Sequence, residues 1–277
     1  MGCRMLSSLS ALPVHLYRCL SCGREGLTQA PGREQGSVAD RVYCPSCGQI
    51  YPITASGAVD FIGSSSDLHL TPAQAIAHLP GFAWGYDRLW RPWALSLLTG
   101  ESFGSERESQ LLAELVGEGD PILDLGTAGG YWSRLILARD PQRTVVGLDN
   151  AAGVLAEAAQ QAQPHWQHYS LMRARAEQLP LASGTFGAVI SGATLNEVPL
   201  DPCLREIARV LKPGGAFVSM HSQQVQGWGQ MVQQWLEATG LHFFSETQLR
   251  EHLQQVGLQL ERYLSLGWVA FVRAVRL

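Results

Sequence analysis

The sequence predicts an α/β protein in which a doubly wound, mainly parallel sheet follows a small cysteine-rich module. Short apolar runs alternate with helical patterns from residue 121 to residue 277. Such alternation is typical of a parallel sheet with helices on both faces. Near the N-terminus, two C-x-x-C pairs, Cys19/Cys22 and Cys44/Cys47, are separated by about twenty residues, a spacing that indicates a metal site.

Composition and charge narrow the function classes. The 277 residues are 46% hydrophobic and 16% charged, as in globular proteins. The net charge is −4 and Lys212 is the single lysine, so the sequence lacks the basic character of a broad nucleic-acid surface. No apolar run approaches the ~20 residues that cross a bilayer, and the N-terminus lacks the apolar core of a signal peptide. We therefore expect a cytoplasmic protein and leave peripheral membrane contact open.

Three parts follow one another along the chain: a zinc-binding module at residues 1–63, a linker and helical lid at 64–116, and a large domain at 117–277. A Ser- and Gly-rich stretch at 63–67 marks the first boundary. Thr71 followed by Pro72 predicts a helix start. The lid is rich in large apolar side chains that we expect to be mostly core, namely Leu79, Phe82, Trp84, Tyr86, Leu89, Trp90, Trp93, Leu97 and Leu98.

The pattern also predicts individual elements. Short β-runs are expected at residues 41–43 and 49–53 of the module. The strands expected in the large domain are 122–125, 144–148, 188–191, 216–220, 259–264 and 269–275. The expected helices are 132–138, 151–162, 201–211 and 245–256. The last of these opens with Ser245 and Gln248, a capping box, and Gly257 closes it.

A small-residue turn at 124–130 follows the first of these strands and opens a helix. Such a turn lets the backbone approach a ligand and presents free helix N–H groups to it. Asp149, at the end of the next strand, can accept hydrogen bonds from both hydroxyls of a ribose. The dinucleotide pattern G-x-G-x-x-G is absent, and Asp124 could pair with an ammonium or with an amide of the turn. S-adenosylmethionine (SAM) carries an ammonium and no pyrophosphate, which favours SAM over a dinucleotide.

Residues 121–277 resemble a class I SAM-dependent methyltransferase of the type 11, quinone-biosynthesis-like group. The segments that carry the resemblance are 124–130, 146–149, 176–181, 186–191 and 205–215. The resemblance implies a seven-stranded, mainly parallel sheet whose last strand is antiparallel. It also implies a set of cofactor-binding residues, namely Asp124, Gly126, Thr127, Gly129, Gly130, Asp149, Asn150, Ala176, Glu177 and Ser191.

Three positions depart from the family pattern. Ala128 stands where the family usually has glycine, and Asn150 replaces a common serine. Arg175 stands where an acid commonly contacts the adenine, and a guanidinium cannot accept a hydrogen bond. These departures keep open a non-catalytic protein with the SAM fold, whose zinc module serves as a partner-binding surface.

The two cysteine pairs supply four thiolates, which complete the tetrahedral shell of a structural zinc ion and leave no open position for catalysis. Residues 51–53 and 57–61 resemble the small zinc protein that activates several tRNA, rRNA and protein methyltransferases. The order of zinc module, helix and methyltransferase domain is similar to that of uncharacterised methyltransferases of cyanobacteria and chloroplasts.

The hypothesis that follows is methyl transfer from SAM to a small, apolar or quinone-like acceptor. Catalysis chiefly requires alignment of nucleophile, methyl and sulfur, with a base where the nucleophile must lose a proton. His221, Glu197 and Tyr86 are the catalytic candidates, and Trp228 and Trp235 either line an acceptor pocket or belong to the core. One alternative is an rRNA or tRNA base methyltransferase that holds RNA with its zinc module, although the weak basicity counts against it.

Overall fold

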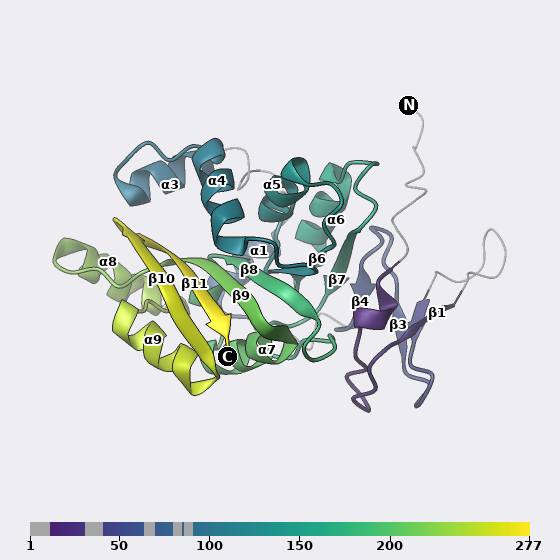
Figure 1. Cartoon of the computed structure of the whole chain (residues 1–277). Coiled ribbons are helices and arrows are strands. Elements are labelled where there is room, and N and C mark those ends of the chain that lie inside the picture. The colour runs from purple at the N-terminus through teal and green to yellow at the C-terminus, as the bar shows by residue number, and fades with distance from the viewer. Residues whose placement is uncertain (1–11, 31–40, 64–69, 80–84, 86–90) are drawn as a thin grey trace.

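The computed structural model describes residues 12–30, 41–63, 70–79, 85 and 91–277, which form two sheets and the helices around them (Figure 1). The larger sheet has eight strands in the order β10-β11-β9-β8-β5-β6-β7-β4. Their bounds are β4 Val59–Asp60, β5 Ile122–Leu125, β6 Val145–Asp149, β7 Tyr169–Arg173, β8 Phe186–Gly192, β9 Leu211–Ser222, β10 Leu258–Leu266 and β11 Val269–Arg276.

The predicted fold class is confirmed, and the sheet has one strand more than the seven that the resemblance implied. β11 is antiparallel to both of its neighbours, whereas β4 to β9 pair in parallel. The extra strand, β4, comes from the cysteine module and pairs with β7. An uncovered β7 would expose a row of unpaired backbone groups, and β4 covers part of that edge.

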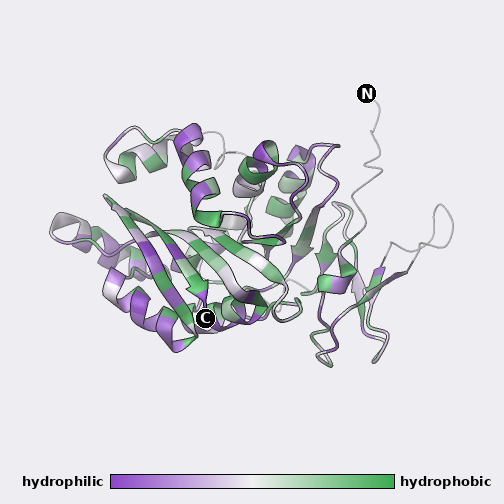
Figure 2. Cartoon of the chain, in the orientation of Figure 1, coloured by the Kyte–Doolittle hydropathy of each residue, from purple (hydrophilic) through white to green (hydrophobic). Residues whose placement is uncertain are grey.

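Helices cover both faces of the sheet, as the strand–helix alternation predicted. They are α3 Arg91–Thr99, α4 Ser105–Val116, α5 Tyr131–Arg139, α6 Ala152–Gln161, α7 Leu200–Val210 and α9 Glu246–Gln255. Apolar residues of α3 to α6 share one core cluster, and those of α7 and α9 share the other. In Figure 2 the central strands are largely hydrophobic, while α9 is strongly hydrophilic on its outer side.

The cysteine module has its own three-stranded antiparallel sheet, formed by β1 Thr28–Ala30, β2 Arg41–Tyr43 and β3 Ile50–Pro52. The apolar side chains of its described residues do not form a separate core. Tyr17, Val42 and Phe61 belong to the same buried cluster as the sheet residue Met172. The module therefore packs onto the large domain as one continuous hydrophobic unit, at the β7 end of the large sheet (Figure 1).

Two short elements shape the surroundings of the site. Helix α1 (Pro72–Ala77) begins at Thr71 with a full capping box, because Thr71 and Gln74 exchange hydrogen bonds. The capping box predicted at Ser245 and Gln248, at the start of α9, is also confirmed.

The second of these elements, helix α8 (Trp228–Glu237), precedes α9 and was not predicted.

Some expectations from the sequence were wrong. The lid side chains Trp93 and Leu97 are 79% and 76% exposed, and Leu79 is also exposed, so these three are not core. Leu98 is partly buried against the core, and the lid residues Phe82, Trp84, Tyr86, Leu89 and Trp90 lie outside the described residues. None of the helices in the described part of the chain is long and apolar enough to span a membrane.

Candidate functional site

A cavity of about 1080 Å³ opens at the carboxyl ends of β5, β6 and β8. Ligands of doubly wound folds bind at this edge of the sheet. The cavity wall brings together most of the residues predicted from the sequence, namely Asp124, Gly126, Thr127, Asp149, Asn150, Ala176, Glu177 and Glu197. Their roles in binding and catalysis stay predictions.

The turn between β5 and α5 is held tightly against the neighbouring strand ends. The N–H groups of Gly126 and Thr127 both donate to the carbonyl of Leu148, at 2.8 and 2.9 Å. Gly126 has φ of +71°, and a Cβ there would lie 1.9 Å from Oγ1 of Thr194. No residue other than glycine fits this position without displacing Thr194.

Asp124 anchors the turn from inside. Its Oδ2 accepts hydrogen bonds from the hydroxyls of Thr127 (2.7 Å) and Ser133 (2.6 Å), and from the Ser133 N–H (3.2 Å). The side chain is buried yet borders the cavity. A carboxylate bonded in this way fixes the start of α5 and contributes negative charge to the cavity wall.

Asp149 and Ala128 face each other across the same turn. The N–H of Ala128 donates to Oδ2 of Asp149 at 3.0 Å, and the N–H of Ala151 donates to Oδ1 at 3.0 Å. Ala128 has φ of +47°, which is unfavourable for a residue with a Cβ. Burial raises the pKa of Asp149, and the N–H donors oppose that shift. An ionised carboxylate has about four acceptor positions, so two bonds leave room for ribose hydroxyls.

Glu197 has the carboxyl group in the cavity best suited to exchange a proton near neutral pH. Burial, reinforced by the negative charge of Asp149, raises the pKa of Glu197 to about 7. Its backbone carbonyl accepts a hydrogen bond from the Gln74 side chain at 2.7 Å, which ties α1 to the loop after β8. A base works best when its pKa is near the working pH.

On the β7 side of the cavity, Arg175 and Glu177 form an ion pair, with Nε of Arg175 2.7 Å from Oε1 of Glu177. Both residues and the intervening Ala176 line the cavity. The unusual arginine therefore has a carboxylate partner of its own, so it adds little uncompensated positive charge to this wall.

The remaining predicted residues lie elsewhere. Gly130 caps α5 with φ of +79°, and a Cβ there would lie 2.8 Å from the hydroxyl of Tyr169. The carbonyl of Gly129 accepts a hydrogen bond from Arg134. Gly129, Gly130 and Ser191 do not line the cavity, and Ser191 is fully buried in β8. Tyr86 lies outside the described residues.

His221 does not reach the cavity either. It is fully buried in β9, with the rings of Phe244 and Tyr263 as neighbours. Burial lowers its pKa to about 4, so the imidazole is neutral at pH 7. Neither ring nitrogen has a hydrogen-bond partner among the described residues. The geometry gives no support to His221 as a base, because no acceptor in the cavity can touch it.

Most of the opposite wall was not predicted from the sequence, although Trp235 was a candidate. Apolar residues from α1 and α8, and from the segments that follow them, line it, namely Pro72, Ile76, Leu79, Trp235, Leu236 and Leu241. Thr194 and His242 also line the cavity and belong to no pattern that marks a site. Asn196, which follows β8, forms hydrogen bonds with Ser222 at the end of β9 and with the carbonyl of His242. It therefore links the segments that follow β8, β9 and α8.

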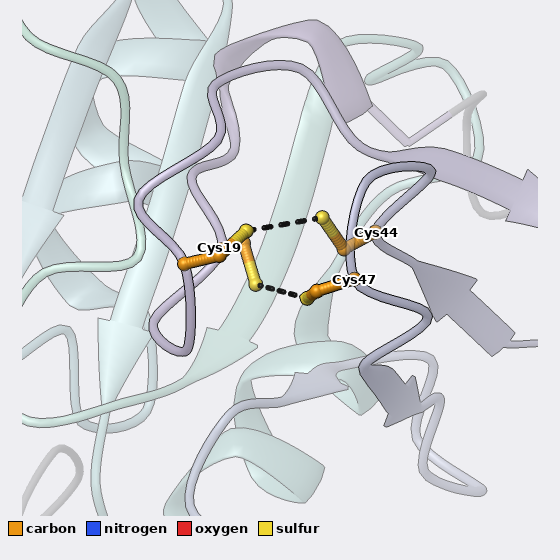
Figure 3. A group of neighbouring side chains, drawn as sticks. Cys19, Cys44 and Cys47 are labelled. Atoms are coloured by element: carbon orange, nitrogen blue, oxygen red, sulfur yellow. Dashed lines mark hydrogen bonds between the residues drawn. The ribbon is translucent and has the colours of Figure 1, made fainter.

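The four cysteines of the N-terminal module form a second candidate site (Figure 3). Their sulfur atoms lie within 4.8 Å of one another, and the Cys19–Cys47 and Cys22–Cys44 distances are both 3.6 Å. Ligands about 2.3 Å from a tetrahedral zinc ion lie about 3.8 Å apart. The arrangement therefore fits a four-thiolate metal site.

Comparison with known proteins agrees with this geometry. Residues 123–219 match the family described as "Methyltransferase domain". An uncharacterized chloroplastic methyltransferase of Arabidopsis thaliana is 27% identical over 67% of this chain and 55% of its own length. The 2-phytyl-1,4-naphtoquinone methyltransferase of Thermosynechococcus vestitus is 35% identical over 46% of this chain and 59% of its own length. The chain thus spans little more than half the length of these curated relatives.

Solved structures share the fold. A chain from the complex of the Haloferax volcanii Trm112 methyltransferase activator with a methyltransferase has a TM-score of 0.56 at 19% identity, covering 72% of this chain and 96% of that one. Geranyl diphosphate C-methyltransferase from Streptomyces coelicolor has a TM-score of 0.53 at 15% identity, covering 65% of this chain and 84% of that one. Residues 123–219 thus match a methyltransferase family, and the large domain has the fold of these solved methyltransferases.

Proposed function

We propose that this chain transfers the methyl group of SAM to a small apolar ring acceptor of the quinone type. The observation that carries the proposal is the two-sided cavity, in which the glycine-rich turn and Asp149 face apolar side chains of α1 and α8. Its volume of about 1080 Å³ lies at the upper end of ligand pockets, so it has room for a cofactor and a second ligand. Two relatives named for quinone biosynthesis support the same acceptor class.

In this proposal SAM supplies an activated methyl group, and the chain supplies position and charge. Asp149 would accept hydrogen bonds from the ribose, and the turn at 126–128 would lie against the cofactor backbone. The acceptor would occupy the apolar side, in line with the methyl–sulfur bond. A reduced quinone ring that gains a methyl on carbon must lose a proton, and Glu197 would take it.

The apolar acceptor side continues onto the outer surface of α8. Trp228, Met231, Val232 and Trp235 are exposed at helical spacing, and Trp235 also lines the cavity. A stripe of this kind normally faces a core, and exposed apolar patches often mark binding sites. It would suit the hydrocarbon tail of an acceptor, and peripheral contact with a membrane stays a prediction.

We further propose that the cysteine module binds zinc. Four thiolates at tetrahedral spacing are the ligand set of structural zinc sites. Such a shell leaves no position for substrate, so the ion would stabilise the module rather than take part in methyl transfer.

A methyl-transfer assay with isotopically labelled SAM tests the proposed acceptor. Zinc-loaded protein is incubated with 1,4-naphthoquinols that carry or lack a hydrocarbon tail, and in parallel with transcribed rRNA fragments. We expect label in the naphthoquinols and a preference for those with a tail. Label in RNA alone would overturn the quinone proposal in favour of a nucleic-acid methyltransferase.

A further inference from the structure

We propose that the cysteine module is a working part of the cofactor site, so that metal binding between its cysteine pairs and SAM binding in the cavity strengthen each other. The inference rests on the proposed function and assigns Arg173 and Asp60 as positioning residues. Two separate sets of contacts between the module and the cavity wall carry it.

The first set runs through a buried ion pair. Asp60, in β4 of the module, contacts Arg173 of β7 with an Oδ2–Nη1 distance of 3.1 Å, and both side chains are about nine-tenths buried. Nε of Arg173 donates to the carbonyl of Asn150 at 3.0 Å, and Nη1 donates to the carbonyl of Gly63 at 2.9 Å. One guanidinium thus joins the module to the residue that follows Asp149.

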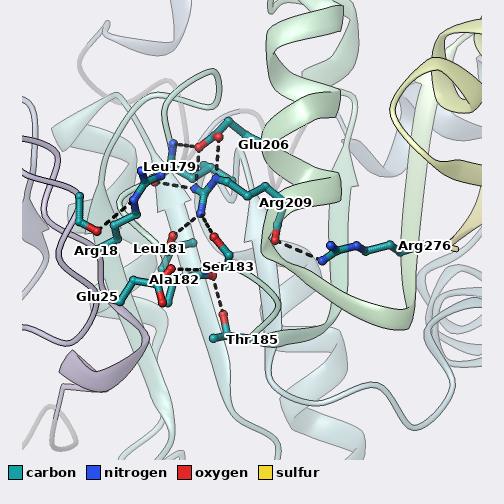
Figure 4. A network of polar contacts seen from close by, with 11 residues as sticks. Arg18, Glu25, Leu179, Leu181, Ala182, Ser183, Thr185, Glu206, Arg209 and Arg276 are labelled. Carbon is teal, nitrogen blue, oxygen red and sulfur yellow. Dashed lines mark hydrogen bonds and ion pairs between the residues drawn. The ribbon is translucent and has the colours of Figure 1, made fainter.

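The second set holds the part of the cofactor side that includes Ala176 and Glu177. The segment that follows Ala176 and Glu177 pairs with the module: the Arg18 N–H donates to the carbonyl of Pro180 at 2.9 Å. The Ser183 N–H donates to Glu25 of the module at 2.9 Å (Figure 4). From the opposite side, Glu206 accepts the N–H of Leu179 at 2.7 Å.

Both sets begin beside the cysteines. Arg18 directly precedes Cys19, whose sulfur lies 3.3 Å from the hydroxyl of Tyr51. The Tyr51 ring packs on Phe61 with centroids 4.4 Å apart, and Phe61 directly follows Asp60. The two cysteine pairs come from different segments, and a metal ion would fix one against the other. Binding of a metal to such a small module contributes directly to its folding.

These contacts predict that the coupling between metal binding and SAM binding is favourable. A metal ion that orders the module also orders the backbone at Asn150 and at residues 176–183, which removes part of the cost of arranging the pocket for SAM. Coupling between two sites is commonly 5- to 150-fold in affinity, and it is reciprocal, so SAM must strengthen metal binding by the same factor.

Calorimetry on zinc-loaded protein tests the positioning role. Asp60→Asn keeps the shape of the side chain but removes its charge, and Glu114→Gln is the matched control because it breaks the exposed Glu114–Arg262 pair far from the module. We expect Asp60→Asn to weaken S-adenosylhomocysteine binding about tenfold and Glu114→Gln less than about twofold. Circular dichroism and zinc content verify that each variant is folded and loaded.

The unmodified protein supplies a second, independent measurement. Competition with a chromophoric chelator gives the zinc affinity with and without saturating S-adenosylhomocysteine, and we expect tighter zinc binding in its presence by at least about fivefold. An unchanged zinc affinity, or an unchanged cofactor affinity in Asp60→Asn, overturns the coupling while the proposed function stands. Folded, zinc-loaded wild-type protein that binds no cofactor overturns both.

Discussion

The two walls of the cavity are built in opposite ways. On the cofactor side, main-chain N–H groups and carboxylates are fixed by short hydrogen bonds, as in the contacts of Asp124 and Asp149. On the acceptor side, Trp235 is 71% exposed and lies beside other apolar residues of α1 and α8. One wall is specified by directional bonds and the other by shape and hydrophobicity, so the two walls should respond differently to substitution.

The largest expected effect is at Gly126. Gly126→Ala places a methyl group where Thr194 lies and forces a left-handed conformation on an alanine. We expect loss of detectable SAM binding and a loss of about 2 kcal/mol or more in the free energy of unfolding. Calorimetry and urea denaturation measure the two. Gly153→Ala in α6 is the control, since a Cβ there meets nothing within 4 Å. Normal SAM binding by Gly126→Ala would show that the turn is not the cofactor site.

Glu197→Gln should affect chemistry more than binding. With a pKa of about 7, Glu197 is protonated and inactive as a base below that pH, so kcat should rise as the pH passes through 7. We expect the variant to lose that rise and to fall about 10²- to 10⁴-fold in kcat, with little change in SAM affinity. The pH profile of kcat checks this expectation. A variant that keeps both the rate and the rise would remove Glu197 from the mechanism.

The raised pKa of Glu197 also predicts how the stability of the protein changes with pH. Its pKa is raised in the folded state, so the folded protein holds this proton more tightly than the unfolded chain does. Its contribution to stability is therefore greatest at acid pH and declines as the pH rises from about 4.5 to 7. Unfolding of the wild type and Glu197→Gln, compared across this range, should show a smaller decline in the variant.

Substitutions in the acceptor wall should weaken acceptor binding rather than SAM binding or folding. Trp235→Ala removes an exposed side chain of the cavity mouth. We expect the acceptor KM to rise about tenfold, while SAM affinity changes less than twofold and stability by less than about 0.5 kcal/mol. Trp93→Ala, on α3 and outside both the cavity lining and the apolar stripe of α8, is the matched control. Equal effects of the two substitutions on KM would argue for a diffuse apolar surface rather than a defined acceptor wall.

The smallest expected effect is at Ala128. Its φ of +47° is more favourable for glycine, so Ala128→Gly should stabilise the protein by up to about 1 kcal/mol. The same change restores the glycine usual in the family, and we expect SAM affinity to hold or improve. Thermal unfolding and calorimetry measure both. A destabilised variant would mean that the methyl group of Ala128 makes packing contacts that outweigh the strain.

The same contrast explains what could be predicted from the sequence. The cofactor wall depends on neighbouring residues in one turn, so Gly126 and Asp149 are recognisable from local spacing alone. The acceptor wall joins α1, α8 and His242, which are far apart in the chain and come together only through the fold. Trp235 was open to two interpretations, because a helical apolar stripe has the same spacing in a core and at a cavity mouth.

The same distinction between local and long-range features applies to the fold. Most strands and helices of the large domain followed from periodicity, but α8 and β7 did not. Ser170 and Arg173 interrupt the apolar pattern of β7, and the burial of Arg173 depends on partners far away in the chain, Asp60 and Gly63 of the module. The addition of β4 to the sheet was equally hidden, since a strand of two residues leaves no periodicity to detect.

The central claim is that SAM binds in the cavity with its ribose on Asp149. Calorimetric titration of SAM and S-adenosylhomocysteine into zinc-loaded wild-type protein and Asp149→Ala tests it most directly. We predict micromolar binding to the wild type and a loss of at least about tenfold in the variant, because two charge-assisted hydrogen bonds disappear. Absence of binding to well-folded wild-type protein, or equal binding to Asp149→Ala, would contradict the claim.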